Sequence, residues 1–202
     1  CRPDLFEVMG YASSRGFPWG MVTNAYNLKP EMVGEAKKSG MKKLVISIDA
    51  LEEDHNWQRG KKLSFKKAVK AVKLFQKAKY VKISQKTSTI TTRNINTLNE
   101  MLKLMIDLKV DHWRLLTVFP NGRAEVDREL ILSNKDYRKV LTFITSVRRK
   151  RLPLRVYYGE EGFLGHEFEG RVRGFFYECK AGTSVGGIWA NGDISACPNL
   201  PP

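Results

Sequence analysis

The most apolar short stretch of the chain covers residues 44–48 and runs directly into Asp49. Its residues show no alternation of apolar and polar types, which indicates a strand buried on both faces, as in a parallel sheet covered by helices. The polar residues 50–60 are predicted to form the loop that follows. Ligands of parallel α/β sheets bind at the carboxyl ends of the strands, so Ser47 and Asp49 are candidate site residues. The alternative is that Asp49 only caps its strand.

Helical and strand patterns alternate over most of the chain. Apolar residues recur at helical spacing within residues 4–15, 29–39, 64–79, a fourth segment that begins at residue 94 or 97 and ends at residue 108, and residues 134–147. Strand patterns cover residues 19–24, 44–49, 80–87, 112–118 and 154–157. Repeated strand–helix units imply right-handed crossovers and a parallel sheet, which is either left open or curled into a barrel.

Polar residues stand at the predicted carboxyl ends of four strands. They are Thr23 and Asn24, Ser47 and Asp49, Lys86 and Thr87, and Thr117. A parallel sheet brings these ends to one rim. A single polar strand end is common, whereas four on one rim indicate a binding site.

The pattern changes after residue 158. Residues 159–170 are rich in glycine and acidic residues, and residues 179–197 predict a β-hairpin that turns at Asn191 and Gly192. Cys179 and Cys197 flank this hairpin, so their thiolates could ligate one iron–sulfur cluster or one zinc ion. Two cysteines do not complete a site of four thiolates, and free cysteines remain the alternative.

The composition narrows the possible functions. The chain has 202 residues, 42% of them hydrophobic, and no apolar run long enough to cross a membrane. Its three cysteines are too few for a disulfide scaffold and fit a reducing compartment. The net charge of +14 could attract nucleic acid, but the lysines of residues 64–79 lie on the helix face opposite the apolar residues, which is typical of a solvated surface. Nucleic-acid binding is therefore not expected.

Several motifs together resemble one enzyme family. They are residues 2–6, residues 22–24, residues 46–49 with His55, Arg59 and Gly60 after them, and residues 120–124. At the C-terminal end, Cys179, twelve intervening residues, Gly192, four residues and Cys197 give a cysteine–glycine–cysteine spacing. On these residues the chain resembles radical S-adenosylmethionine (SAM) enzymes of the SPASM subgroup, which modify peptides and proteins and carry auxiliary iron–sulfur clusters.

The resemblance implies a fold and a set of site residues. It implies a partial parallel (β/α)6 TIM-like barrel that lacks its first strands in residues 1–158, and the start of a SPASM segment with a cysteine-bearing β-hairpin in residues 159–202. Thr23, Asn24, Ser47 and Asp49 would contact SAM, and Arg59 would pair with the SAM carboxylate. Arg59 left in solvent is the alternative. Cys179 and Cys197 would ligate an auxiliary [4Fe-4S] cluster, with further ligands beyond residue 202.

The chain also departs from the family pattern. It contains neither the CxxxCxxC motif, whose thiolates hold the SAM-binding [4Fe-4S] cluster, nor the Gly-Gly-Glu segment of the following strand. Both would precede residue 1, so the chain is expected to be a fragment that is inactive without them. Ala25 also replaces the glycine usual after Thr-Asn, where a tight backbone approach is expected.

The resemblance implies reductive cleavage of SAM to a 5′-deoxyadenosyl radical that modifies a peptide or protein substrate. It further implies an electron donor such as a flavodoxin or ferredoxin, and a cytoplasmic location. Two alternatives stay open at this point. One is a binding module without catalysis, motivated by the missing motif and the positive charge, and the other is a radical SAM protein that acts on RNA.

Overall fold

The computed structural model describes residues 2–79, 83–120, 122–159 and 162–197. The chain divides into two compact units, residues 1–160 and 161–202. Each is described by itself below. Within the described residues, no helix is both long and apolar enough to cross a membrane.

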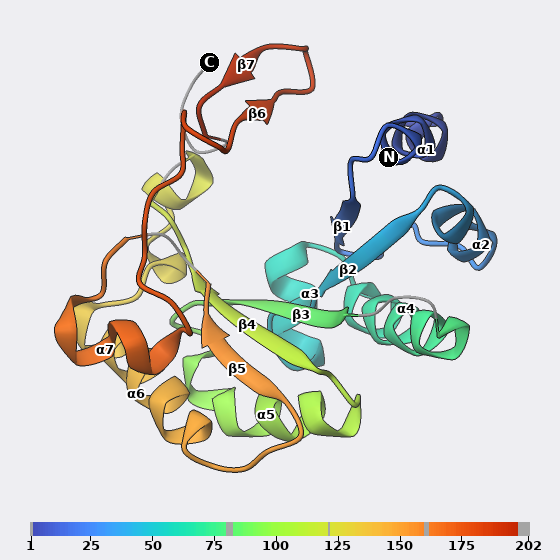
Figure 1. Ribbon diagram of the computed structural model, residues 1–202. Coiled ribbons are helices and arrows are strands. Elements are labelled where there is room, and N and C mark those ends of the chain that lie inside the picture. The colour runs from blue at the N-terminus through green and yellow to red at the C-terminus, as the bar shows by residue number, and fades with distance from the viewer. Residues whose placement is uncertain (1, 80–82, 121, 160–161, 198–202) are drawn as a thin grey trace. The chain divides into compact units, whose positions relative to one another are not determined.

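The first unit is built on a five-stranded parallel sheet with strand order β1-β2-β3-β4-β5 (Figure 1). The strands are β1 (Trp19–Thr23), β2 (Met41–Ser47), β3 (Ile83–Ile90), β4 (His112–Thr117) and β5 (Arg155–Tyr158). Sequential strands pair with each other throughout, as repeated strand–helix units require. The predicted α/β fold with a parallel sheet is confirmed, and the described strands form an open sheet with β1 and β5 at its edges.

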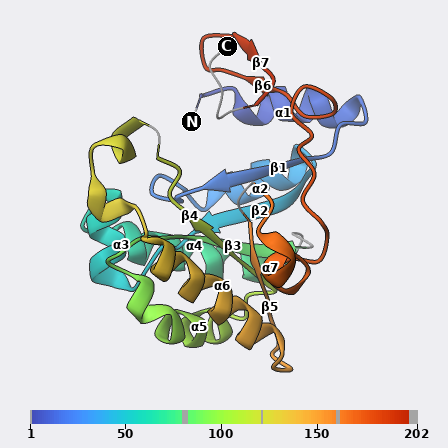
Figure 2. The same ribbon diagram turned by 90° about the vertical axis from the view of Figure 1, so that its left-hand side faces the viewer.

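Helices connect the strands of this unit. They are α1 (Leu5–Ser14), α2 (Glu31–Lys38), α3 (Glu52–Arg59), α4 (Ser64–Ala78), α5 (Leu98–Asp107) and α6 (Asn134–Arg148). Short 3-10 turns follow β3 and β4 at Ile95–Thr97, Gly122–Glu125 and Arg128–Leu130. Figure 2 shows α4, α5 and α6 gathered on one side of the sheet.

The core lies between this side of the sheet and the helices. Leu44 and Ile46 of β2 are at most 2% exposed, and they line the same cavity as Val72 and Phe75 of α4. Trp113 of β4 is fully buried, with its ring edge-to-face against Phe143 of α6 at 6.1 Å between centroids. Such aromatic packing stabilises beyond the area it buries.

The two faces of the sheet differ in character along β4 and β5. Trp113, Leu115, Val156 and Tyr158 point to the helices and are buried, whereas the residues between them are half-buried or exposed. This period of two is the pattern of strands with only one apolar face. The opposite face of the sheet is therefore available for polar side chains.

Helix α3 corrects the prediction of a loop over residues 50–60. Its eight residues lack an apolar stripe, so periodicity could not reveal it. The signals that were present are Glu52, Glu53 and Asp54 in the first turn and Gly60, which ends the helix at φ +62°. Acidic residues at a helix N-terminus and glycine after its C-terminus both stabilise helices.

Strand β3 is also displaced from its prediction. The sequence predicted residues 80–87, of which residues 80–82 lie outside the described residues, whereas the strand continues to Ile90. Residues 87–89 are all Ser or Thr and lack the expected apolar alternation. Ser88 nevertheless donates a hydrogen bond to the carbonyl of Ile48 and accepts one from Trp113 Nε1 at 2.8 Å. Hydrogen bonds to neighbouring segments thus extend the strand.

The second unit contains helix α7 (Gly165–Val172) and the antiparallel pair β6 (Gly187–Ile188) and β7 (Ile194–Ser195). Trp189 N donates to Asp193 O at 2.8 Å, and Gly192 adopts φ +95° in the turn. The predicted hairpin at Asn191 and Gly192 is therefore present. Helix α7 was not predicted, because the glycines of this segment disfavour a helix in isolation.

Candidate functional site

Asp49 lies just beyond the carboxyl end of β2 and is fully buried. Its Oδ2 accepts a hydrogen bond from Arg59 Nε at 2.6 Å, and its Oδ1 accepts one from the backbone N–H of Thr89 at 3.1 Å. Both carboxylate oxygens are therefore occupied by partners from α3 and β3. A buried carboxylate held in this way fixes the geometry of the rim.

Asn94 binds the backbone of the same segment. Its Nδ2 donates to Asp49 O and to Thr89 O, both at 2.9 Å, and its Oδ1 accepts from Thr91 N at 2.9 Å. One buried amide thus satisfies three backbone groups where β2 and β3 end. Irregular backbone at a sheet rim needs such partners, because buried unpaired polar groups are costly.

His55 of α3 is fully buried beside Asp49. Its Nδ1 accepts the backbone N–H of Asp49 at 3.0 Å, and its Nε2 lies 3.2 Å from Ser64 Oγ. Burial lowers the pKa of His55, although the nearby Asp49 carboxylate opposes this shift. The hydrogen bonds assign the neutral tautomer with the proton on Nε2, so His55 serves to position the rim.

Arg59 is the last residue of α3, and its side chain is 30% exposed. Only its Nε is used on Asp49, so the terminal Nη groups keep their donors. Arg59 lines a cavity of about 320 Å³ together with Trp57 and Gln58 of α3, with Thr89 and Val118 near the ends of two strands, and with Asp127 and Leu130. Pairing of Arg59 with a SAM carboxylate remains a prediction, and Asp49 orients the guanidinium for it.

Ser47 is the last residue of β2 and is 9% exposed. In the parallel register it pairs with Thr87 of β3, which places both side chains on the face opposite the helices. Ser47 and Asp49 lie two residues apart at this strand end. The structure therefore brings Ser47, Asp49 and Arg59 together at one rim.

Thr23 and Asn24 shape the turn after β1. Thr23 Oγ1 accepts the N–H of Ala25 at 3.0 Å, and Asn24 Oδ1 accepts that of Tyr26 at 3.1 Å. In the parallel register Thr23 pairs with Ile46 and not with Ser47. It lines a cavity of about 540 Å³ with residues of α1 and α2. The side chain of Thr23 is thus on the helix side, apart from Ser47.

Ala25 adopts φ +57° and is 3% exposed. Because the left-handed region is unfavourable for residues with a Cβ, Ala25→Gly is expected to raise the free energy of unfolding by about 0.5–1 kcal/mol, as measured by urea denaturation. Ala36→Gly, in the middle of α2, is the matched control and should lower it by about 1 kcal/mol. An equal loss in both variants would contradict strain at residue 25.

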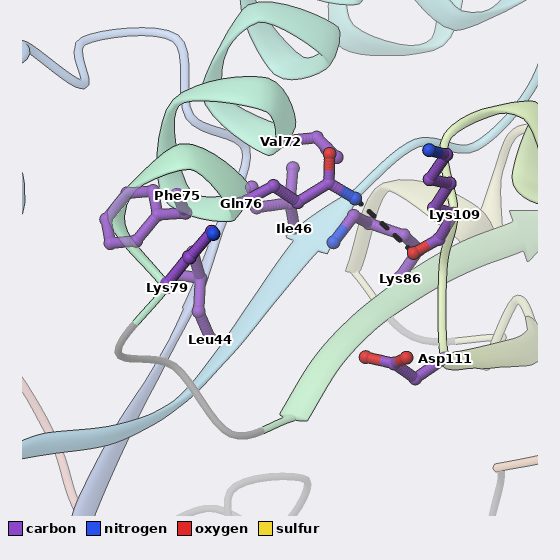
Figure 3. Close-up of a pocket in the computed structure, with 9 residues that line it drawn as sticks. All are labelled: Leu44, Ile46, Val72, Phe75, Gln76, Lys79, Lys86, Lys109 and Asp111. Carbon is purple, nitrogen blue, oxygen red and sulfur yellow. Dashed lines mark hydrogen bonds between the residues drawn. The ribbon is translucent and has the colours of Figure 1, made fainter.

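Lys86 does not lie at the rim as predicted. It is in the middle of β3, 2% exposed, on the helix side of the sheet. Figure 3 shows it beside a cavity of about 530 Å³, with Ile46, Val72 and Gln76 on one side and Asp111 on the other. Loss of water lowers the pKa of Lys86 to about 8, although the charge of Asp111 opposes this.

Near pH 7 the wild type buries the charged ammonium of Lys86 in its native state, which is unfavourable. Lys86→Met removes this charge and is therefore expected to raise the free energy of unfolding by about 1–3 kcal/mol. Between the folded pKa of about 8 and the unfolded value of 10.5, the unfolded chain binds more protons, so wild-type stability rises with pH. The difference in the free energy of unfolding between the variant and the wild type should therefore shrink as the pH rises through this window, as measured by urea denaturation at successive pH values. Lys73→Met, on the exposed face of α4, should show no such window.

Thr117 ends β4 as predicted, but it is bound to neighbouring tyrosines. Its Oγ1 lies 3.0 Å from Tyr158 Oη, which accepts a hydrogen bond from Tyr137 Oη at 2.9 Å. This chain links β4 and β5 to α6. Thr117 therefore has a structural role at this rim.

The two cysteines of the second unit differ in environment. Cys179 is exposed, Cys197 is buried, and neither forms a disulfide. Ser195 Oγ donates to Cys197 O at 3.0 Å and accepts from Trp189 Nε1 at 2.9 Å, which ties the end of the hairpin to its turn. Among the described residues, no group of three or more His, Cys, Asp or Glu side chains could hold a metal. Ligation of a cluster by Cys179 and Cys197 remains a prediction.

Sequence reasoning missed another buried charge in the second unit. Glu169 of α7 is fully buried, accepts the backbone N–H groups of Leu164 at 2.9 Å and Tyr177 at 2.7 Å, and pairs with Arg173 at 3.2 Å. Glu169 and Arg173 are spaced i, i+4, a pattern visible in the sequence once the helix is known. The pair holds the chain before and after α7.

The open parallel sheet, with buried polar residues gathered at the carboxyl end of β2, defines an α/β protein of the kind in which a ligand is expected at that rim. Residues 1–108 match the family described as the Radical SAM superfamily. The chain belongs to this superfamily. The family implies SAM and a [4Fe-4S] cluster as cofactors.

Curated relatives share modest sequence identity with the chain. The AdoMet-dependent heme synthase of Methanosarcina barkeri is 27% identical over 150 residues, 74% of this chain and 42% of that protein. The protein of the same name from Nitratidesulfovibrio vulgaris is 26% identical, over 73% of this chain and 40% of its own length. The chain thus spans less than half the length of these relatives.

Solved structures share the fold. Streptococcus suis SuiB bound to S-adenosylmethionine superposes with a TM-score of 0.72 at 18% identity, over 97% of this chain and 46% of SuiB. Native anSMEcpe with bound AdoMet and Cp18Cys peptide gives a TM-score of 0.55 at 19% identity, over 69% of this chain and 41% of its own. These likenesses support the partial TIM-like barrel expected from the sequence.

Proposed function

We propose that the gene product carrying this chain is a radical SAM enzyme that cleaves SAM reductively and modifies a bound substrate. The observation that carries the proposal is the family match over residues 1–108 together with Ser47, Asp49 and Arg59 at the end of β2. A reduced [4Fe-4S] cluster bound beside SAM would supply the one electron that cleaves SAM to methionine and a 5′-deoxyadenosyl radical, the species that would take a hydrogen atom from the substrate. The three-cysteine motif that holds this cluster in the family is absent from this sequence, so the activity is proposed for the gene product and not for these residues alone.

The residues at the rim fit SAM. Arg59 offers donors beside a cavity, and a guanidinium pairs well with the carboxylate of an amino acid. Asp49 holds Arg59 in place, while Ser47 offers a hydroxyl on the same strand end. Asn24 and Thr23 line the cavity beside α1 and α2 and shape the turn after β1, and the side-chain amide of Asn24 is the donor proposed to reach SAM from there. The chain's part is to orient SAM and keep water from it.

Ser47→Ala is expected to weaken SAM binding about tenfold, because a hydrogen bond from a neutral hydroxyl to a charged group is typically worth 1.5–3 kcal/mol. The dissociation constant would be measured by anaerobic equilibrium dialysis on the full gene product. Ser146→Ala, on the exposed side of α6, is the control that should leave SAM affinity unchanged. Equal affinities of wild type and Ser47→Ala would remove Ser47 from the site.

We further propose that Cys179 and Cys197 ligate an auxiliary [4Fe-4S] cluster in a SPASM segment that starts near residue 159. Two thiols from this chain supply only part of a cluster site, so other ligands are required. The test is the iron and sulfide content of the anaerobically reconstituted gene product beside a variant carrying Cys179→Ala and Cys197→Ala. Loss of one cluster's iron, with a SAM-responsive EPR signal retained, is expected. Equal iron content would make both cysteines structural.

The substrate is proposed to be a peptide or protein, since solved structures of the same fold are described with bound peptides. A flavodoxin or ferredoxin would supply the electron. A second candidate substrate is a tetrapyrrole, favoured by the curated relatives named heme synthases. Incubation of the reconstituted protein with each substrate class, followed by mass spectrometry, separates the two.

A further inference from the structure

Polar side chains form a row across the face of the sheet opposite the helices. The parallel register places Ser47 of β2 beside Thr87 of β3, Thr87 beside Arg114 of β4, and Arg114 beside Tyr157 of β5. Side chains at paired positions of neighbouring strands point to the same face. The row therefore begins at a residue proposed to contact SAM and leads away from it across three further strands.

Two buried residues on this face have polar atoms without a hydrogen-bond partner. Gln85 is 1% exposed and its Nε2 has none, and Thr87 is 4% exposed and its Oγ1 has none. A buried donor left without a partner is destabilising, because it has lost its hydrogen bonds to water. Unsatisfied groups of this kind, two residues apart on one strand face, indicate a ligand that completes their hydrogen bonds.

Arg114 is the charged centre of the row. Its buried Nε also has no hydrogen-bond partner, and no acidic residue pairs with its guanidinium among the described residues. It lies close enough to Tyr157 for its charge to oppose the rise that burial causes in the pKa of that phenol. An arginine beside two unsatisfied groups provides a positive charge and several donors in one place.

Gly159 makes room for Arg114. A Cβ at residue 159 would lie 2.2 Å from Arg114 Cδ and 2.3 Å from Cγ. The stem of Arg114 therefore runs along the backbone just beyond the end of β5, toward the carboxyl end of the sheet. This close approach holds the guanidinium on the same side as the rim, where SAM is proposed to bind.

The positions of this face that the register defines on β2–β5 include no carboxylate. Asp49 follows Ser47 by two residues, and its carboxylate is already bound to Arg59 and to the backbone N–H of Thr89. Within the residues that the structure describes, these donors and this positive charge have no acidic partner, and such a group favours an anion. A carboxylate matches the planar fork of arginine, with the neutral donors beside it. Phosphate usually binds at the backbone N–H groups of a helix N-terminus, and none of the groups in this row is of that kind.

We propose that Arg114, Gln85 and Thr87, with Tyr157 beside them, bind a carboxylate group of the substrate next to SAM. This inference rests on the proposed function and adds the chemical class of the substrate. A glutamate or aspartate side chain of a peptide and a propionate of a tetrapyrrole carry the same group. The site thus recognises a feature common to both candidate substrates.

The test measures binding of two carboxylate probes to the full gene product at high ionic strength. One is a fluorescein-labelled oligoglutamate peptide and the other is coproporphyrin, whose carboxylates are propionates, and the controls are the glutamine peptide and the methyl ester of coproporphyrin. Wild type is expected to bind at least one probe and to bind its neutral control much more weakly. The probe that binds identifies the source of the carboxylate, and inorganic phosphate should not compete.

Arg114→Gln is expected to weaken binding of that probe about 10- to 100-fold, because it removes a charge-assisted pair. Arg114→Lys should restore part of the affinity, and Gly159→Ala should weaken binding at unchanged charge by displacing the arginine stem. Arg151→Gln, an exposed arginine outside the row, controls for the loss of one positive charge. SAM affinity should stay within about twofold in all variants if each fold is intact.

The outcomes separate the two proposals. If neither probe binds wild type, or if Arg114→Gln and Gly159→Ala bind as wild type does, or if phosphate competes fully, the carboxylate site is overturned while the SAM proposal stands. If Arg114→Gln does not fold, the carboxylate site is overturned when Gly159→Ala and Gln85→Leu both bind the probe as wild type does. Failure of wild type to cleave SAM, with probe binding dependent on Arg114, would overturn the proposed activity and leave the carboxylate site.

Discussion

Asp49→Ala is expected to lower the free energy of unfolding by about 3–5 kcal/mol, the range found when one partner of a buried ion pair is removed. Asp49 is fully buried, and it accepts hydrogen bonds from Arg59 at 2.6 Å and from Thr89 N at 3.1 Å. The alanine variant would leave the Thr89 N–H buried without a partner and Arg59 without its counter-charge. Urea denaturation followed by circular dichroism measures the loss.

Two further variants test the cause of this loss. Asp49→Asn keeps the shape and one acceptor, so it should retain part of the stability and show how much the charge contributes. Asp54→Ala removes an acid of the same helix region whose pair with Arg93, at 3.2 Å, is partly exposed, and should cost at most about 1 kcal/mol. Equal losses for Asp49→Ala and Asp54→Ala would contradict a structural role of the buried carboxylate.

Trp113→Ala is expected to lower the free energy of unfolding by about 3–5 kcal/mol, as found for large-to-small changes in cores. Trp113 is fully buried, packs on Phe143, and donates from Nε1 to Ser88 Oγ at 2.8 Å. Ser88 in turn donates to the carbonyl of Ile48, next to Asp49. The variant therefore removes core volume and a hydrogen bond that supports the rim, and thermal unfolding by calorimetry measures the sum.

Trp113→Phe separates these contributions, since it keeps most of the ring volume but not the donor and should cost less than the alanine change. Trp57→Ala is the matched control at an exposed site, where the ring stacks with Arg93 at 4.2 Å from its centroid. It should cost about 1 kcal/mol or less. A loss at Trp57 as large as that at Trp113 would contradict the assignment of Trp113 to the core.

The sequence predicted the parallel sheet and the polar end of β2, because both follow from local pattern. Residues 44–48 are apolar except for Ser47 and are followed by the acid Asp49, and strand–helix units repeat along the chain. Whether the sheet stays open or closes depends on strand number and tilt, which periodicity does not report. The resemblance to a known family supplied the barrel expectation.

The contacts at the rim could not be predicted from pattern. Helix α3 has no apolar stripe, so the position of Arg59 against Asp49 was hidden in an apparent loop. The extension of β3 past Thr87 depends on Ser88 binding Ile48 and Trp113, which are distant in sequence. Because β3 continues to Ile90, Lys86 lies in the middle of the strand, on the side of the sheet that faces the core, and not at the predicted rim. Such side-chain partners arise only when the whole sheet assembles.

The most direct test of the central claim is formation of 5′-deoxyadenosine from SAM by the full gene product. The protein would be reconstituted anaerobically with iron and sulfide, reduced, incubated with SAM and assayed by liquid chromatography and mass spectrometry. A radical SAM enzyme is predicted to release 5′-deoxyadenosine and methionine in equal amounts, with a lower rate for Ser47→Ala at limiting SAM. No 5′-deoxyadenosine from a protein that contains its full cluster and binds SAM would contradict the proposed function.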